Sequence, residues 1–375
     1  MMSNQGIVSA RHVDHVGMTV PNLDEAIRFF EDALGGLLLW RVGPFHETAT
    51  GVPINSVQIA MLRLGPSLNI ELLEFDADQQ QRKMPSNIDM GAGHIAFFVD
   101  DILAAAESLR KHGAELLQGP LEGAGEEKKG EKIWYFKTPW GAFMEILWRP
   151  DHLPYEQKTG NRLFNQKGPW WNRPVTQGIQ SAKHVDHVGM VVPDLDAAVE
   201  FFEDALGAQL LWRVGPFHKT PTGVPIKSVI LAMLRLGPNL NIELQAFEAE
   251  QQEKHLPSNV DFGATHIAIF VEDMQAAAAS LAGSGAELLH GPIETAGDAK
   301  KGEQIWYFKT PWGGLMEILW RPDHLPYEET TENRLFQRPR GRRMVSRKRR
   351  VSLENHHAIS QGQGRINACC GQVAR

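Results

Sequence analysis

The chain of 375 residues repeats itself without gaps at a spacing of 172 residues, as from His15 to His187. The segment HVDHVGM at 12–18 returns at 184–190, and IWYFKTPWG at 133–141 returns at 305–313. Self-similarity of this extent indicates a duplication. The period is too long for a solenoid unit, so each copy is predicted to be a domain in its own right.

Four residues of the types that bind metal ions recur at equal positions in the two copies. Surface positions have drifted between the copies, as at Glu47 against Lys219 and Gln58 against Ile230, yet neither copy has lost a member of this set. The set comprises His15, Glu71, His94 and Glu145 in the first copy and His187, Glu243, His266 and Glu317 in the second.

A second repeat lies inside each copy. HVGMTVPNLDEA, from His15, resembles HIAFFVDDILAA, from His94. In both, an extended run leads into apolar residues at helical spacing, which stop at Gly35 in one case and at Gly113 in the other. Three short extended runs follow each helix, so each module is predicted to be a strand, a helix and three strands.

This organisation places the histidines on the first strand of each module and the glutamates on the last. Alternation along LNIELLEF puts Glu71 on the face opposite Ile70 and Leu72, and AFMEILW behaves in the same way around Glu145. A carboxylate within an apolar strand must be paired or bound to a metal, because burying an isolated charge is very costly. Two modules with matching histidines therefore favour one shared ion.

Paired modules of this kind resemble the vicinal oxygen chelate superfamily, which includes glyoxalase I, methylmalonyl-CoA epimerase, fosfomycin-resistance proteins and extradiol dioxygenases. The segment YFKTPWGAFMEI resembles the closing strand motif of that group. The resemblance implies an α+β fold with two tandem domains, each of two βαβββ modules that form a cupped, open mixed β-barrel around a metal ion. We expect domains at 10–156 and 184–328, a linker at 157–183 and a disordered basic and polar tail at 338–375.

The resemblance also implies the ligands. They would be His15, Glu71, His94 and Glu145 in the first copy and His187, Glu243, His266 and Glu317 in the second. Nitrogen and oxygen donors without thiolate suit Zn, Mn, Fe(II), Co or Ni. Open positions on the ion would admit a small-molecule substrate with two vicinal oxygens, and Glu71, Glu145, Glu243 and Glu317 are the candidate bases for removing a proton next to a chelated carbonyl.

Three reactions or roles remain open within this frame. Isomerase or lyase chemistry, similar to methylmalonyl-CoA epimerase or glyoxalase, is the first choice, although Gln58 and Ile230 stand where the epimerases carry a further catalytic Glu. An extradiol dioxygenase is the alternative, because Tyr135 and Tyr307 precede Glu145 and Glu317 by ten residues, but the His of that motif is missing. A metal-free binding protein is the third.

Each copy could complete its own site, or the copies could exchange modules, and the sequence allows both arrangements. Self-association is compatible with either.

The composition of the chain limits the binding partners and the cellular compartment that we expect. The formal charge of −7 gives no reason to expect nucleic-acid binding, and neither a membrane span nor a signal peptide is indicated, so a cytoplasmic enzyme is expected. Only Cys369 and Cys370 occur, which excludes a thiolate site in either copy. Lys128 lies near a Gly-rich turn and is expected on a solvated surface loop.

Overall fold

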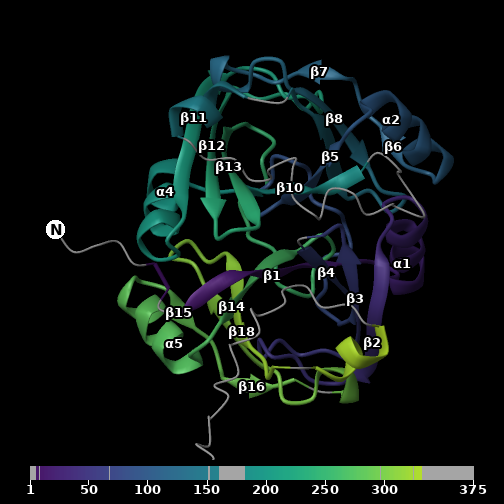
Figure 1. The fold of residues 1–375 in the computed structure, drawn as a ribbon, viewed down its shortest axis with the longest axis vertical. Coiled ribbons are helices and arrows are strands. Elements are labelled where there is room, and N and C mark those ends of the chain that lie inside the picture. The colour runs from purple at the N-terminus through teal and green to yellow at the C-terminus, as the bar shows by residue number, and fades with distance from the viewer. Residues whose placement is uncertain are drawn as a thin grey trace, which may run out of the picture. The chain divides into compact units, whose positions relative to one another are not determined.

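The structure of the chain is a computed structural model that describes residues 6–7, 9–66, 68–150, 153–159, 182–295, 297–323 and 325–331. Figure 1 shows its helices and strands in chain order. The tail at 338–375 and most of the linker lie outside the described residues.

The first module has the predicted order of one strand, one helix and three strands. The helix begins after Asn22, whose side chain accepts a hydrogen bond from the backbone N–H of Glu25 at 2.8 Å. Its apolar side, which includes Phe29 and Phe30, is buried. The elements are β1 (Ala10–Thr19), α1 (Leu23–Asp32), β2 (Leu37–Phe45), β3 (Ser56–Leu64) and β4 (Leu68–Asp76).

The second module departs from prediction in its middle strand. The expected run AELLQG forms only two strand residues, and a further short strand follows after the turn at Gly119 and Pro120, which cannot donate a ladder hydrogen bond. The elements are β5 (Gly93–Val99), α2 (Ile102–Lys111), β6 (Glu115–Leu116), β7 (Leu121–Glu122), the 3₁₀ turn η1 (Glu126–Lys128), β8 (Lys132–Lys137), β9 (Phe143–Trp148) and α3 (Pro154–Thr159).

The second copy repeats this order. Its first module contains β10 (Ala182–Val191), α4 (Leu195–Asp204), β11 (Gln209–Phe217), β12 (Ser228–Leu236) and β13 (Leu240–Glu248). Its second module contains β14 (Thr265–Val271), α5 (Met274–Gly283), β15 (Glu287–Leu288), β16 (Ile293–Glu294), the 3₁₀ turn η3 (Asp298–Lys300), β17 (Gln304–Lys309), β18 (Leu315–Trp320) and α6 (Pro326–Thr331).

The strands form two mixed sheets of nine strands, which confirms the α+β class and the pairing of two modules in each sheet. The first sheet runs β2, β3, β4, β1, β14, β18, β17, β15, with β16 on β17. The second runs β11, β12, β13, β10, β5, β9, β8, β6, with β7 on β8. Each sheet contains both kinds of pair, as the parallel pairing of β1 with β4 and the antiparallel pairing of β3 with β4 show in the first sheet.

Each sheet joins modules from different copies. In the first sheet, β1 of copy one pairs antiparallel with β14 of copy two. In the second, β10 of copy two pairs antiparallel with β5 of copy one. Of the two arrangements that the sequence allows, the structure has the exchanged one.

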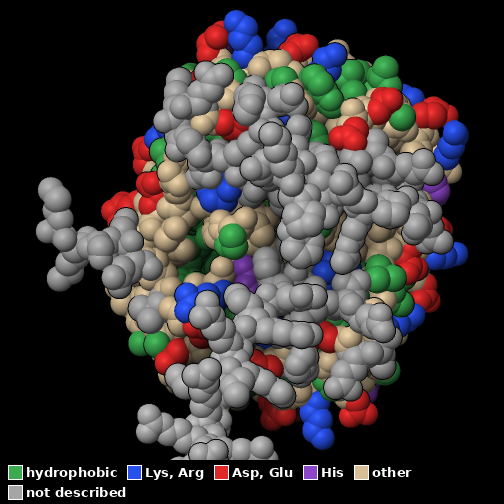
Figure 2. Space-filling model, in the orientation of Figure 1, with side chains coloured by type: hydrophobic (Ala, Val, Ile, Leu, Met, Phe, Trp, Pro, Cys, Tyr) green, Lys and Arg blue, Asp and Glu red, His purple; other side chains and the backbone are tan. Residues whose placement is uncertain are grey.

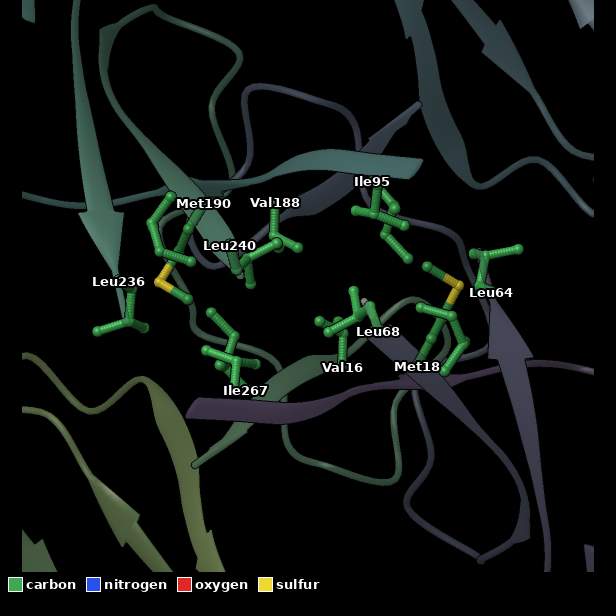
Figure 3. Packing of buried hydrophobic residues seen from close by; sticks show 14 of the residues in the cluster. Val16, Met18, Leu64, Leu68, Ile95, Val188, Met190, Leu236, Leu240 and Ile267 are labelled. Carbon is green, nitrogen blue, oxygen red and sulfur yellow. The ribbon is translucent and has the colours of Figure 1, made fainter. Parts of the chain in front are cut away.

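Both sheets contribute to the largest buried cluster, part of which Figure 3 shows. Val16 and Ile267 enter it from the first sheet, and Ile95 and Val188 enter it from the second. All four are 1% exposed or less. Burial of this much apolar area is the main favourable contribution to folding.

On the face shown in Figure 2, acidic and basic side chains are interspersed among the described residues. In the part of the chain that the structure describes, no helix is both long and apolar enough to span a bilayer.

Candidate metal centres and active sites

Strand register brings four of the predicted residues together in the first sheet. Gly17 of β1 stands opposite Glu71 of β4 on one side and opposite His266 of β14 on the other. His15, two residues earlier and therefore on the same face, stands opposite Ala268, which in turn stands opposite Glu317 of β18. These two sets of paired residues are adjacent along the strands, so the side chains of His15, Glu71, His266 and Glu317 lie on one face of the sheet.

These four residues, His15, Glu71, His266 and Glu317, are called the first site. His15 Nε2 lies 3.7 Å from Glu71 Oε2. His266 Nε2 lies 3.6 Å from Glu71 Oε2 and 3.6 Å from Glu317 Oε2. Ligand atoms of His15, His266 and Glu317 all lie within 4.8 Å of one another, a spacing that one ion could bridge.

The other four, His187, Glu243, His94 and Glu145, are called the second site, and the same register in the second sheet assembles them. His94 Nε2 lies 3.3 Å from His187 Nε2 and 3.6 Å from Glu145 Oε2. Glu243 Oε2 lies 3.8 Å from His94 Nε2 and 3.9 Å from His187 Nε2.

All eight predicted residues are thus buried in two clusters, and each cluster combines residues of both copies, which is one of the two arrangements that the sequence leaves open. His15 and Glu71 meet His266 and Glu317, not His94 and Glu145. The reason is the strand pairing, because β1 is hydrogen-bonded to β14 and not to β5. Each site therefore takes one His and one Glu from each copy.

Gly17 and Gly189 are required by the close approach of an imidazole. A Cβ at Gly17 would lie 1.9 Å from Cε1 of His266, and one at Gly189 would lie 1.9 Å from Cε1 of His94. No side chain can occupy such a space, so each glycine admits the histidine of the neighbouring strand.

A buried carboxylate beside each site was missed by sequence reasoning. His15 Nδ1 donates a hydrogen bond to Asp14 Oδ1 at 3.2 Å, and Asp14 Oδ2 lies 2.6 Å from Arg321 Nη1. Alternation would place Asp14 and His15 on opposite faces, but a shift in register between Val13 and His15 marks a bulge that re-aims the side chains.

The second site repeats this arrangement. His187 Nδ1 donates to Asp186 Oδ1 at 3.1 Å, and Asp186 Oδ2 lies 2.5 Å from Arg149 Nη1. A carboxylate in this position fixes which imidazole nitrogen faces a metal and raises the basicity of the ligand.

The expectation of a solvated Lys128 is wrong. Lys128 is 6% exposed, its Nζ lies 3.0 Å from Glu131 Oε2 and 3.7 Å from Glu243 Oε1, and it stacks over Trp212. Lys300 is placed in the same way, with Nζ 3.8 Å from Glu71 Oε1. The 3₁₀ turns η1 and η3 carry these lysines inward, which their sequence alone does not indicate.

Tyr135 and Tyr307, the tyrosines on which the dioxygenase alternative depends, face the sites. Tyr135 Oη lies 3.5 Å from His94 Nε2, and the rings of Tyr307 and His266 are 5.3 Å apart. Trp134, next to Tyr135, points to the other face and belongs to the main core.

Gln58 does not face the first site. Its neighbours Val57 and Ile59 line the cavity there, while Gln58 Oε1 accepts a hydrogen bond from Arg41 at 2.9 Å on the other face. Gln58 and Ile230, which stand where the epimerases carry a further glutamate, therefore lie on the strand face that points away from the sites.

The two imidazoles of each site differ in protonation. Burial alone would lower the pKa of His15, but its hydrogen bond with Asp14 and the neighbouring carboxylates raise that pKa to about 9. Burial lowers the pKa of His266 to about 4. In the second site the pKa of His187 is likewise raised to about 9, and burial lowers that of His94 to about 3.

The carboxylates also separate into two kinds. Burial raises the pKa of Glu317 and of Glu145 to about 7. For Glu71 and Glu243, burial acts in the same direction, but the neighbouring imidazoles and lysine ammonium groups together lower the pKa. Divergent environments of this kind assign different roles to paired carboxylates.

A cavity of about 700 Å³ opens at the first site. His15, Glu71 and Glu317 line it, with Tyr307 and Lys300. This volume falls in the range of sites for small molecules and cofactors.

A family model described as the Glyoxalase/Bleomycin resistance protein/Dioxygenase superfamily matches residues 14–135 and again residues 186–307. The chain belongs to this superfamily. The resemblance to the vicinal oxygen chelate group is therefore confirmed, with one match in each copy of the duplication.

Relatives within the superfamily include enzymes of several kinds. The 2-epi-5-epi-valiolone epimerase of an Actinomyces species is 38% identical over 180 residues, which are 45% of this chain and 96% of that protein. An ethylmalonyl-CoA/methylmalonyl-CoA epimerase of Cereibacter sphaeroides is 31% identical over 121 residues, 32% of this chain and 79% of that protein. A lactoylglutathione lyase of Arabidopsis thaliana is 26% identical over 213 residues, 56% of this chain and 60% of that protein.

Glyoxalase I from Zea mays has the same superfamily fold. Its crystal structure matches with a TM-score of 0.55 and 20% identity, over 82% of this chain and 92% of that chain. At this level of identity the likeness concerns the fold alone.

Proposed function

We propose that the protein is a divalent-metal-dependent epimerase or isomerase that removes a proton from the carbon next to a carbonyl group. The observation that carries the proposal is the convergence, in each site, of two imidazole nitrogens and two carboxylates that are almost fully buried.

The donor set fits a metal ion. His15 Nε2, His266 Nε2 and Glu317 Oε1 are buried without a hydrogen-bond partner among the residues that the structure describes. Buried polar atoms ordinarily have such partners, and His15 Nε2 and His266 Nε2 instead lie 3.7 and 3.6 Å from the same oxygen, Glu71 Oε2, so their convergence favours a bound cation. Two nitrogen and two oxygen donors would hold Zn, Mn, Fe, Co or Ni and leave coordination positions open.

A metal ion held there would act as a Lewis acid on a chelated substrate carbonyl. Glu317 and Glu145, whose pKa burial raises to about 7 in the fold without metal, are our candidates for the ligand that accepts the proton and returns it. Glu71 and Glu243, with a lowered pKa, stay ionised and act as ligands. Tyr307 and Lys300 line the cavity, where they can orient a substrate oxygen.

The names of the relatives support this class of reaction. Two are epimerases, and the ending of valiolone denotes a ketone. We propose a small molecule with two vicinal oxygens, one of them a carbonyl, as the substrate class.

Metal analysis of the purified protein, combined with two assays, tests the proposal. We expect about two ions per chain and incorporation of solvent deuterium into hydroxylated ketones or acyl thioesters without oxygen uptake. Oxygen consumption with catechols would overturn the proposal in favour of a ring-cleaving dioxygenase. Full-length protein that binds no divalent metal at all would favour a binding protein.

A further inference from the structure

We infer that the two sites of one chain bind ligands of different polarity, the first site an apolar substituent next to the chelating oxygens and the second site a carboxylate-bearing one. The inference rests on the proposed function, because it concerns the substrate class of these same sites.

The position two residues after the glutamate on β4 and β13 differs in chemistry between the sites. It faces the site, since alternate residues of a strand share a face. At the first site it is Leu73, which is 7% exposed and lines the cavity. At the second site the residue 172 positions later is Gln245, which is 6% exposed.

Gln245 changes the surroundings of the second site directly. Its Nε2 donates a hydrogen bond at 2.7 Å to Glu243 Oε2, the oxygen that faces the imidazoles of His94 and His187. In the first site, the corresponding glutamate oxygen, Glu71 Oε2, faces His15 and His266 beside the leucine side chain.

A buried amide favours a polar ligand over an apolar one. Besides its bond to Glu243, Gln245 keeps a second N–H and an amide oxygen, so an apolar substituent pressed against it would leave this capacity unpaired, whereas a hydroxyl could pair with either group and a carboxylate with the N–H. The reverse holds at Leu73, where a polar substituent would lose its hydration and gain no partner.

Residues that line the first cavity also differ in charge from the residues at the equivalent positions of the second site. Glu47 and His290 line the first cavity, and their counterparts are Lys219 and Gln118. Glu47 and Lys219 are exposed, so their charges act mainly by steering a ligand toward the opening. A lysine in place of a glutamate favours an anionic ligand at the second site, in the same direction as Gln245.

The deeper residues are alike in the two sites. Each has the same four ligand-type residues, a buried lysine at Lys300 or Lys128 and a tyrosine at Tyr307 or Tyr135. The differences therefore lie on the wall and rim, where they would select the substituent and leave the chemistry the same.

The test uses full-length, Co²⁺-loaded protein with one site removed. His94→Ala leaves the first site, and His266→Ala leaves the second. Two hydroxamates serve as probes, because both chelate through vicinal oxygens: benzohydroxamate carries an apolar ring, and the monohydroxamate of succinic acid carries a carboxylate. Dissociation constants are measured from changes in the Co²⁺ absorption spectrum.

We expect the ratio of the two dissociation constants to differ by about 10-fold or more between the variants, with the first site preferring benzohydroxamate. Leu73→Gln in the His94→Ala protein should shift the ratio toward the carboxylate probe, and Gln245→Leu in the His266→Ala protein should shift it the other way. Gly189→Ala and Gly17→Ala provide the same pair of single-site proteins independently if a histidine variant fails to fold.

Equal ratios at two sites that both hold Co²⁺ would overturn this inference and leave the proposed function standing. Failure of every single-site protein and of the wild type to bind Co²⁺ would overturn the proposed function, and the inference with it.

Discussion

At the scale of single residues, each site depends on two histidines and two glutamates that are buried together and away from solvent. The histidines and glutamates are buried, and their pKa values move apart because each has different charged neighbours. Gly17 and Gly189 are equally important, because the absence of a Cβ leaves room for the imidazole rings of His266 and His94.

Gly17→Ala should abolish the first site and leave the second intact, because the added methyl group would occupy the position of the His266 ring. The bound metal should fall from about two ions to about one ion per chain, as measured by elemental analysis. Gly283→Ala, where a Cβ would meet no atom within 4 Å, is the matched control. Two retained ions in Gly17→Ala would contradict the close approach.

Glu145→Gln combined with Glu317→Gln should reduce deuterium exchange by at least about 100-fold, because the amides cannot accept a proton. Each single variant should keep the activity of the other site. Circular dichroism should report an intact fold, and Glu107→Gln, on the exposed face of α2, should behave as wild type. Unchanged turnover in the double variant would exclude these carboxylates as bases.

Metal should stabilise the protein more as the pH rises from about 6.5 to 9. The pKa of His15 and of His187 is raised to about 9 in the metal-free fold, so their stabilising contribution is complete below about 6.5 and is lost as the pH approaches 9. Metal binding must displace these protons and therefore strengthens over the same interval.

Thermal unfolding with and without Zn²⁺ at several pH values measures this effect. Metal at 100 times its dissociation constant contributes about 2.7 kcal/mol per site. A gain in Tm that decreases with rising pH would contradict the assignment of these histidines.

At the scale of secondary-structure elements, strand register and a bulge assemble the sites. Strand pairing at Gly17 and at His15 places Glu71 of β4, His266 of β14 and Glu317 of β18 on the same face of the sheet. The bulge in β1 brings Asp14 to His15, and Arg321, just after β18, holds the other oxygen of Asp14.

Asp14→Asn should weaken metal binding at the first site by about 10- to 100-fold, because the amide no longer fixes and polarises the imidazole of His15. Asp186→Asn should do the same at the second site. Isothermal titration with Zn²⁺ should resolve one weakened and one unchanged site in each variant, so the unaltered site serves as the internal control. Two unchanged affinities would exclude a role for this carboxylate.

At the scale of the whole molecule, the exchange of modules means that each site contains residues from both copies. First modules form one half of each sheet, and second modules of the opposite copy form the other half. A copy without its partner therefore contains halves of two sites.

Two double variants of the full chain test the exchange. His15→Ala with His266→Ala removes two ligands from one site and should leave about one metal ion per chain. His15→Ala with His94→Ala removes one ligand from each site and should leave none. Sites built within single copies would give the reverse pattern, and elemental analysis distinguishes the two.

Much of the fold was predictable because its evidence is local. Apolar residues at helical spacing, which stop at Gly35 and at Gly113, mark the helices, and alternation around Glu71 and Glu145 marks the strands. The duplication identified all eight candidate ligands, because surface residues differ between the two copies while these histidines and glutamates are the same in both. The inward position of Lys128 and the contact of Asp14 with His15 were not predictable, because a turn and a bulge set them.

The sequence by itself determined the modules, their order and the residue types that converge. Only the tertiary structure decided which modules pair, because the edges of β1 and β10 are almost identical in sequence and either could accept β5 or β14 by local criteria. The pairing of modules depends on packing between residues that are far apart in the sequence. For that reason His15 shares its site with His266 of the other copy and not with His94 of its own.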